Sequence, residues 1–282
     1  MSDTTIEWTD KTWNPVSGCT KVSAGCKNCY AERVFPRAYH RDIELSGSDQ
    51  PRRRDFTDVR IHPDRLDQPL RWRKPARVFV NSMSDLFHED VPDDFIFQVY
   101  RVMGHARQHT FQILTKRPQR MLELQTRWRD AGTPIANVWL GVSCEDQKTA
   151  DERIPLLLQT PAAVRFVSAE PLLGPIDFIG KDAQGSALHP YERDAKLDWL
   201  IIGGESGPNA RPFNLQWGRD IIEQCKAANV PVFFKQVGSN SFYTQEVGTA
   251  KGEGFRFHDI NDRKGGDPAE WPEDLRVREF PA

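Results

Sequence analysis

Short apolar runs alternate with amphipathic segments from residue 77 onward, and this alternation restricts the fold more than any other feature of the 282-residue chain. Runs of strand length begin near residues 77, 110, 137, 164, 197 and 230. Helical patterns follow at 91–109, 118–131, 147–159 and 215–228, the first with Phe95, Val99 and Val102 on one face. Strands that alternate with helices predict a parallel sheet with helices packed outside it.

A further strand at residues 12–16 would bring the sheet to seven strands, which suits an open or incomplete (β/α) barrel. A doubly wound sheet is the alternative. Residues 171–196 are too rich in Gly and Pro for a full helix and are predicted to be a loop insertion. Residues 46–70 predict a polar loop with short helical pieces. We expect a barrel domain over 1–238 and a mostly irregular C-terminal extension over 239–282 that packs on it.

Three cysteines, Cys19, Cys26 and Cys29, lie on one predicted loop, residues 17–30, with the spacing C-x6-C-x2-C. Structural zinc is normally closed by four protein ligands. A [4Fe–4S] cluster also needs four ligands, so three cysteines would leave one iron open to another molecule. The triad therefore indicates a reactive metal centre.

The cellular compartment decides how the five cysteines are interpreted. The first residues lack the basic and apolar regions of a signal peptide, and no run approaches the ~18 apolar residues of a membrane span. We therefore expect a cytoplasmic protein with no membrane partner, in which clustered cysteines indicate metal or redox chemistry rather than disulfides. Cys144 and Cys225 lie in apolar segments and are predicted to be small buried side chains.

Polar residues end all six apolar runs, and in parallel α/β folds such ends form the ligand site. One group alone would be a helix cap or a rim salt bridge, but six groups together favour a pocket. The candidates for cofactor binding are Tyr30, Ser82, Ser84, Ser143, Glu145, Gly203, Gly204 and Glu205. The candidates for substrate binding are Lys116, Arg117, Glu170 and Lys235. No catalytic residue is assigned.

Each cofactor candidate also has a structural interpretation. Gly203 and Gly204 would let a ligand approach the backbone while Glu205 holds an amine, or the three residues simply form a tight turn. The serines either bind a ribose or carboxylate or cap the helices that follow. Tyr30 either covers an adenine ring or the cluster, or it begins a helix and points into the core. Trp8 and Trp13, which precede the cysteine loop, are predicted to be core residues.

The charge of the chain is unevenly distributed. The net charge is −2, yet residues 1–120 carry 20 Lys and Arg against 16 Asp and Glu. Basic residues cluster at 52–54, at 71–77 around Trp72, and at 116–120. Such clusters either track a phosphate backbone or form an ordinary solvated surface, so DNA or RNA is a candidate partner.

A three-cysteine loop at the first strand of a (β/α) barrel resembles the radical S-adenosylmethionine (SAM) enzymes, most of which have C-x3-C-x2-C. The complete set of motifs resembles the phage Gp37/Gp68 family, an uncharacterised family of three-Cys-motif proteins. These motifs are Cys-Tyr-Ala-Glu-Arg at 29–33, Val-Asn-Ser-Met-Ser-Asp-Leu-Phe at 80–87, Leu-Thr-Lys-Arg-Pro at 114–118, Gly-Val-Ser at 141–143, Ser-Ala-Glu-Pro-Leu at 168–172, Gly-Gly-Glu-Ser-Gly at 203–207 and Trp-Pro-Glu-Asp-Leu-Arg-Val-Arg at 271–278.

The resemblance implies a barrel of the radical SAM type, with Cys19, Cys26 and Cys29 holding three irons of a [4Fe–4S] cluster. The amine and carboxylate of SAM would bind the fourth iron. Electron transfer from an external one-electron reductant would then generate a 5′-deoxyadenosyl radical, with the protein positioning cofactor and substrate. Analogy with nucleic-acid-modifying relatives, together with the basic clusters, makes modification or repair of a nucleic acid the candidate reaction.

Two other functions compete with this one. The first is a zinc-stabilised, non-enzymatic nucleic-acid-binding protein, in which His40 would be the fourth ligand at a spacing unusual for zinc. The second is an α/β binding domain whose cysteines hold no metal. The substrate, the reductant and the oligomeric state do not follow from the sequence.

Overall fold

The computed structural model describes residues 4–39, 43–45, 51–129, 134–179, 186–188, 195–243, 255–256 and 260–281. Within this part of the chain, seven strands form one sheet in the order β1-β6-β7-β8-β9-β10-β12. The strands are β1 (Lys11–Trp13), β6 (Arg77–Val80), β7 (Thr110–Thr115), β8 (Val138–Ser143), β9 (Val164–Ala169), β10 (Trp199–Gly203) and β12 (Val232–Gln236).

The α/β class and the positions of the predicted strands are confirmed. The strands follow one another in chain order, without the reversal that defines a doubly wound sheet. This order is compatible with an incomplete (β/α) barrel. The chain divides into two compact units, residues 1–140 with 161–163 and residues 141–160 with 164–282, so that β8 contributes to both. Each unit is described by itself below.

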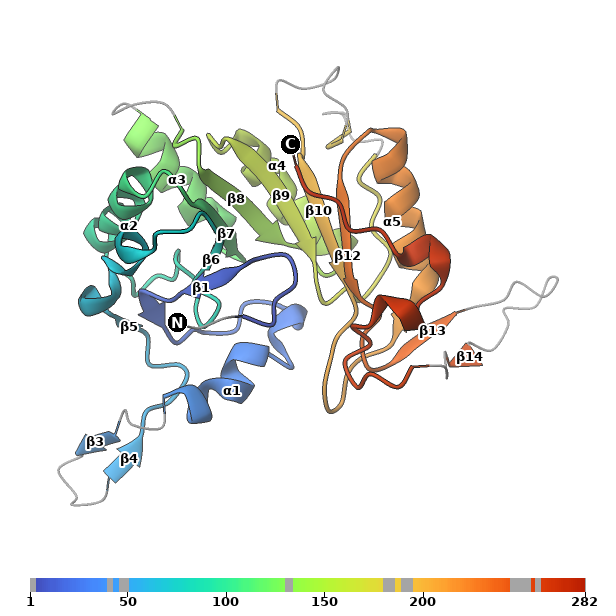
Figure 1. The fold of residues 1–282 in the computed structure, drawn as a ribbon, viewed down its shortest axis with the longest axis horizontal. Coiled ribbons are helices and arrows are strands. Elements are labelled where there is room, and N and C mark those ends of the chain that lie inside the picture. Colours follow the sequence, from blue (N-terminus) through green and yellow to red (C-terminus); the bar gives the residue numbers. More distant parts are fainter. Residues whose placement is uncertain are drawn as a thin grey trace. The chain divides into compact units, whose positions relative to one another are not determined.

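In the first unit, β6 pairs in parallel with β1 on one side and with β7 on the other (Figure 1). Helix α2 (Asp93–His105) connects β6 to β7, and α3 (Pro118–Arg129) follows β7. Trp8 and Trp13 are buried, as predicted, and the Trp13 indole donates a hydrogen bond to the Arg65 carbonyl at 2.8 Å. Helix α2 is shorter than predicted because Pro92 lies just outside it, with an extended backbone at its N-cap.

The face that α2 buries is also slightly different from the predicted one. Phe95 and Val99 are buried as expected, but Val102 is not, and the buried face continues at Met103 instead. The predicted helix reached residue 109, whereas α2 ends at His105. Tyr100 is also buried on this helix, so the apolar stripe is broader than the sequence pattern indicated.

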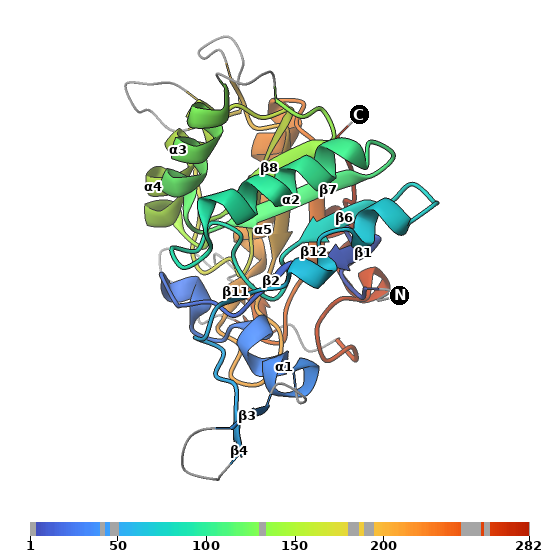
Figure 2. The same cartoon turned by 90° about the vertical axis from the view of Figure 1, so that its left-hand side faces the viewer.

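The segment between β1 and β6 contains the remaining elements of the first unit. β2 (Val16–Ser17) pairs antiparallel with β5 (Arg60–Ile61), and β3 (Ile43–Leu45) pairs antiparallel with β4 (Pro51–Arg53). The other elements are η1 (Ala24–Cys26), α1 (Tyr30–Ala38), η2 (Pro63–Arg65) and η3 (Gln68–Arg71). Figures 1 and 2 show the β3–β4 ribbon beyond α1, away from the strands of the unit's sheet. The short helical pieces predicted between residues 46 and 70 are therefore present.

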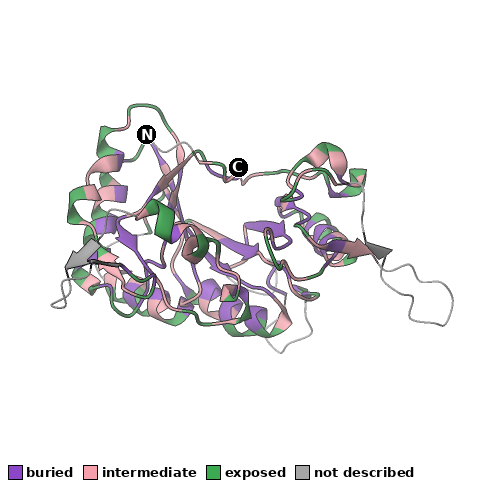
Figure 3. Ribbon diagram, turned by 90° about the horizontal axis from the view of Figure 1, so that it is seen from below, coloured by how far each residue is buried: buried purple, intermediate pink, exposed green. Residues whose placement is uncertain are grey.

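In the second unit, β10 pairs in parallel with β9 and with β12, and all five of its residues are buried. A continuously buried strand is typical of a parallel sheet covered on both faces. Figure 3 shows the buried residues concentrated on the strands and on one side of the helices. Helix α4 (Gln147–Gln159) begins with a capping box between Asp146 and Thr149, and α5 (Leu215–Ala227) is capped by Asn214.

The end of the chain packs within the second unit. The Phe234 amide donates to the Val277 carbonyl at 2.8 Å, and Trp271 lies edge-on against Phe234. The small elements here are β11 (Phe213–Asn214), β13 (Ser241–Tyr243), β14 (Phe255–Arg256), η4 (Pro268–Glu270) and η5 (Glu273–Leu275). The described parts of residues 171–196 contain neither helix nor strand, as predicted. None of the helices described is long and apolar enough to cross a membrane.

Candidate functional site

The cysteine loop leaves the sheet through Gly18, which has a positive φ of 92°. A Cβ atom on this residue would lie 2.5 Å from the Asp58 carbonyl oxygen, so glycine is required there. The Gly18 amide donates to the Met83 carbonyl at 3.1 Å, and the Cys19 amide donates to the Phe56 carbonyl at 2.9 Å. The start of the loop is therefore fixed to the segment that follows β6.

All three loop cysteines are free thiols with intermediate exposure. Cys19 and Cys29 pack against one apolar cluster formed by Phe35, Phe56 and Met83. The third thiol, Cys26, ends the short helix η1. Two of the three thiols of the loop thus lie against one apolar cluster.

Tyr30 begins helix α1, and the residue is 54% exposed. The interpretation of Tyr30 as a core residue is therefore wrong, although the helix does begin where that interpretation placed it. Arg33 lies over the ring at 5.8 Å from its centroid. A role of Tyr30 in covering a cofactor stays a prediction.

Asp85, which follows β6, is a buried carboxylate that joins several groups of a polar network. Its Oδ1 accepts hydrogen bonds from the Thr115 hydroxyl at 2.7 Å and from the Phe87 amide at 3.0 Å. Its Oδ2 accepts from the Lys116 amide at 3.0 Å and from the Arg117 guanidinium at 3.3 Å. The carboxylate therefore joins the end of β6 to the end of β7.

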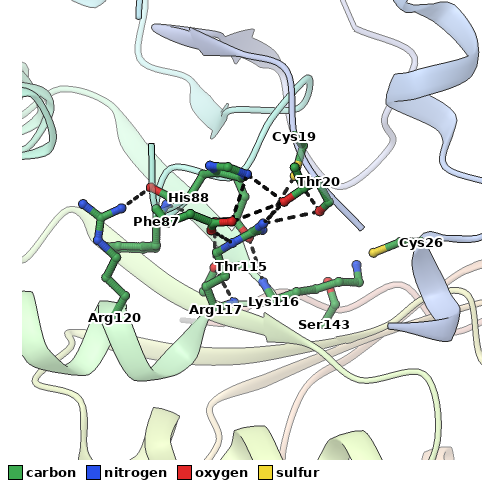
Figure 4. A network of polar contacts seen from close by, with 12 residues as sticks. Cys19, Thr20, Cys26, Phe87, His88, Thr115, Lys116, Arg117, Arg120 and Ser143 are labelled. Carbon is green, nitrogen blue, oxygen red and sulfur yellow. Dashed lines mark hydrogen bonds and ion pairs between the residues drawn. The ribbon is translucent and has the colours of Figure 1, made fainter. Parts of the chain in front are cut away.

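Arg117 extends this network to the cysteine loop (Figure 4). Its Nη1 lies 3.6 Å from the Cys19 Sγ, and its Nη2 donates to the Thr20 carbonyl at 3.3 Å and to the Thr20 hydroxyl at 2.8 Å. Its Nε donates to Glu89 at 2.9 Å. With a side chain only 10% exposed and all three guanidinium nitrogens engaged, Arg117 is fixed in place.

His88 completes the network as a neutral donor. Its Nδ1 accepts a hydrogen bond from the Asp90 amide at 3.1 Å, so the ring proton is on Nε2, which donates to the Thr20 hydroxyl at 2.8 Å. Burial, and then the positive charge of Arg117, lower the pKa of His88 below its usual value. The Thr20 hydroxyl is consequently held by two donors, His88 and Arg117.

The thiol of Cys19 lies in a site that favours its protonated form. Burial, followed by the negative charge of Asp85, raises the pKa of Cys19 to about 11, while Arg117 acts in the opposite direction. A thiol must lose its proton to bind a metal. Arg117 is therefore the group of this network that favours the thiolate.

In the second unit, the carboxylate that follows β8 is closed off by an arginine. Glu145 is 1% exposed, and its Oε2 lies 3.0 Å from Nη1 of Arg153 on α4. The same nitrogen donates to the Ser143 carbonyl at 2.6 Å. Because this pair is buried and internally satisfied, it serves to dock α4 on the sheet; cofactor binding by Ser143 and Glu145 stays a prediction.

The carboxylate after β10 has a similar partner. Glu205 is buried and accepts from Arg211 at 2.5 Å to Oε1 and at 3.0 Å to Oε2. A Cβ atom on Gly204 would lie 2.8 Å from the carbonyl carbon of Val237 and closer still to its oxygen. Close packing against Val237 therefore explains the glycine at position 204. The predicted contact of Gly204 with a cofactor stays a prediction.

Two of the predicted substrate-binding residues meet at the ends of β9 and β12. Glu170 and Lys235 form an ion pair in which each side chain keeps nearly a fifth of its surface exposed. Gly203 lies beside this pair, since a Cβ atom there would be 3.4 Å from the Glu170 side chain. This is the most open of the three ion pairs at the strand ends of the second unit.

The serines after β6 do not cap a helix. The Ser82 hydroxyl donates to Asn14 Oδ1 at 3.2 Å, and the Ser84 hydroxyl donates to the Val16 carbonyl at 2.9 Å. The capping interpretation is wrong for both residues because they tie this segment to the start of the cysteine loop. Their binding of a cofactor stays a prediction.

The basic clusters differ in how their charges are used. Arg54 is buried and donates to the Ser17 and Asp58 carbonyls at 2.8 and 2.7 Å. Arg120 is occupied by Asp93 at 2.7 Å and by backbone carbonyls. The exposed residues are Arg71, Arg73 and Lys74, around the half-buried Trp72. The side chains of Arg52 and Arg53 lie outside the described residues. So does His40, the fourth ligand of the alternative zinc site.

The donor chemistry of the loop fits a thiolate-bound metal centre. Three free thiols lie within eleven residues, and Cys26 is close enough to Cys19 to affect its charge. In the described ranges, no three or more Cys, His, Asp or Glu side chains are gathered closely enough to hold a metal ion. The thiols of the loop would have to draw together around a cluster.

The network contains residues that the sequence did not single out. Thr20, Asp85, His88 and Glu89 are not among the predicted site residues. The signals that the sequence offers are that Thr20 is adjacent to Cys19 and that His88 directly follows the apolar pair at 86–87. Thr20 meets His88 and Arg117, which lie 68 and 97 positions further along the chain.

The fold and this site define an α/β protein with a three-cysteine loop next to its first strands. A family model described as "Protein of unknown function (DUF5131)" matches residues 3–261. The chain belongs to this family. No curated protein and no solved structure matched the chain. The predicted membership of an uncharacterised family is thereby confirmed at this level.

Proposed function

We propose that this chain is a radical SAM enzyme of the Gp37/Gp68 type, with a [4Fe–4S] cluster held by Cys19, Cys26 and Cys29. The observation that carries the proposal is the cysteine loop itself. Its three thiols are free, two of them pack against one apolar cluster, and Cys19 receives a contact from a fixed guanidinium. Three ligands leave one iron open, which is where the amine and carboxylate of SAM would bind.

The residues of the chain would hold and orient the reactants. When bound and reduced, a [4Fe–4S] cluster supplies one electron to the sulfonium of SAM, which breaks the C5′–S bond and releases methionine. Asp85 and Arg117 would keep the cysteine loop in place against the strand ends of the first unit. In the second unit, Glu170 and Lys235 are the substrate-binding candidates, and both side chains keep part of their surface exposed.

The proposal is tested by anaerobic reconstitution with iron and sulfide, followed by dithionite and SAM. The wild-type protein is expected to release 5′-deoxyadenosine and methionine in equal amounts. The variant Cys26→Ala should release neither, since a cluster with two cysteine ligands would not form stably. Wild-type protein that carries a cluster yet leaves SAM intact would contradict the enzymatic assignment.

We propose a nucleic acid as the substrate class, on the strength of the exposed residues Arg71, Arg73 and Lys74. Contacts to phosphates release counterions, so binding should weaken steeply with salt. Replacing the three residues with Ala should lower the affinity for DNA or RNA and the salt slope. The matched control replaces Arg127, Lys148 and Lys226, which are exposed and carry the same total charge. Absence of binding at low ionic strength would overturn this substrate class and leave the cluster chemistry unaffected.

A further inference from the structure

We propose that Arg117 is a positioning residue for the metal centre, which orients Cys19 and donates a charged N–H···S hydrogen bond to it. The inference rests on the proposed function in one respect, the presence of the cluster. The contacts of the arginine are independent of that assumption. They connect the thiol to two strands of the sheet through a single side chain.

The first argument is the way in which Arg117 is held. The three nitrogens of its guanidinium contact four partners: Nε bonds Glu89, Nη2 bonds Thr20, and Nη1 bonds both Asp85 and Cys19. Asp85 is in turn fixed by the Thr115 hydroxyl at 2.7 Å. A planar fork that is held at several points has little freedom left, so the direction of its bond to the thiol is set by the sheet.

The second argument is the asymmetry among the three cysteines. In the described part of the chain, the Cys26 Sγ has the Ser23 hydroxyl as its hydrogen-bond partner, at 4.0 Å, and Cys29 packs against the apolar cluster. Cys19 is the thiol with a guanidinium at 3.6 Å. The three ligands would therefore not be equivalent, because Cys19 combines a guanidinium contact with the nearby carboxylate of Asp85.

The consequence for the cluster is electrostatic. Hydrogen bonds to the sulfur ligands are among the factors that set the reduction potential of an iron–sulfur cluster. A positively charged donor stabilises the more negative, reduced state, so it raises the potential. Groups that orient a metal ligand also contribute to metal affinity, and their loss typically lowers it about 10- to 100-fold.

The test compares Arg117→Gln with wild-type protein after anaerobic reconstitution. We expect the variant to have a lower midpoint potential and to release iron to a chelator about 10- to 100-fold faster. Arg117→Lys keeps the positive charge but loses the planar guanidinium. Its midpoint potential should therefore lie between those of Arg117→Gln and wild type, while its iron release should stay nearly as fast as in Arg117→Gln. The matched control is Arg127→Gln. Arg127 lies on α3, is exposed and bonds Asp93 at 2.9 Å, so its loss should change neither quantity.

The outcomes separate the inference from the proposed function. If Arg117→Gln binds iron with an unchanged potential and an unchanged release rate, the positioning role is wrong and the cluster assignment stands. If wild-type protein binds no iron, the proposed function itself fails, and this inference with it. Should Arg117→Gln not fold, as judged by circular dichroism, the same two measurements on Thr20→Val decide. That variant removes one hydrogen-bond acceptor of Arg117, so it should also release iron faster than wild type. A release rate equal to that of wild type would overturn the inference.

Discussion

The strand ends of the two units carry similar residues but use them differently. In the second unit, Glu145 is paired with Arg153 and Glu205 with Arg211, and in each pair the arginine lies within eight residues of the carboxylate along the chain. In the first unit, Asp85 is paired with Arg117, but that arginine also reaches the cysteine loop about a hundred residues earlier. A buried ion pair can therefore either fix a helix or connect a reactive loop to the sheet.

This difference indicates where chemistry is expected. A buried charge is costly unless it is paired and hydrogen-bonded, and both kinds of pair meet this condition through their carboxylates. Of these pairs, the one in the first unit places a cation against a cysteine of the loop. The proposed metal centre would therefore lie in the first unit, whereas the pairs of Glu145 and Glu205 hold segments of the second unit together.

The largest expected effect comes from removing a buried carboxylate in each unit. Asp85→Ala removes the buried carboxylate partner of Arg117 and leaves it only the exposed Glu89, and Glu145→Ala removes the buried carboxylate partner of Arg153. Each variant should therefore lower the free energy of unfolding in urea by about 3–5 kcal/mol. The two variants should differ in iron content after reconstitution at a temperature where both are folded. Asp85→Ala should lose most of its iron, whereas Glu145→Ala should retain it. Equal iron content in the two variants would contradict the distinction between the units.

A smaller effect is expected at Gly203, the last residue of β10, and at the adjacent Gly204. Gly204→Ala forces a Cβ atom against the backbone of Val237, so it should lower the free energy of unfolding by about 1–3 kcal/mol. Gly203→Ala meets only the side chains of Gln236 and Glu170, at 3.4 Å, and should cost less. Thermal unfolding of both variants checks the difference. A more stable Gly204→Ala would mean that this position is open, as a pure cofactor contact would require.

The smallest effect concerns the reactivity of Cys19 in metal-free protein. Its raised pKa of about 11 keeps the neutral thiol dominant at physiological pH. The thiolate is the form that reacts, so the rate of alkylation by iodoacetamide at Cys19 should rise about tenfold per pH unit between pH 8 and 10. Mass spectrometry of the Cys19 peptide measures this rate. A plateau reached below pH 9 would show that Arg117 outweighs the effect of burial.

The sequence predicted the framework better than the site. Apolar runs such as residues 197–203 have the length of a strand and end in polar residues, so the positions of the strands follow from the sequence. The spacing of the cysteines also indicated their common loop. The ends of helices were predicted less accurately than the strands, because a proline such as Pro92 fits both the first turn of a helix and the position just before it.

The connections within the site could not be predicted because they depend on distant partners. Nothing near Arg117 in the sequence shows that its guanidinium meets Thr20, 97 residues earlier, rather than solvent or a phosphate. The same holds for Arg54, which appeared to belong to an exposed basic cluster and is buried against Ser17. Periodicity reports which face is apolar, but it does not report which polar groups meet across the sheet.

The central claim is that the cysteine loop holds an iron–sulfur cluster, and the most direct test is the metal content of five single variants after anaerobic reconstitution. Wild-type protein should contain about four irons and four sulfides per chain. Cys19→Ala, Cys26→Ala and Cys29→Ala should each lose most of them. Cys144→Ala and Cys225→Ala, at buried positions outside the loop, should retain them. Stoichiometric zinc without iron in the wild type, or full iron content in all three loop variants, would contradict the account.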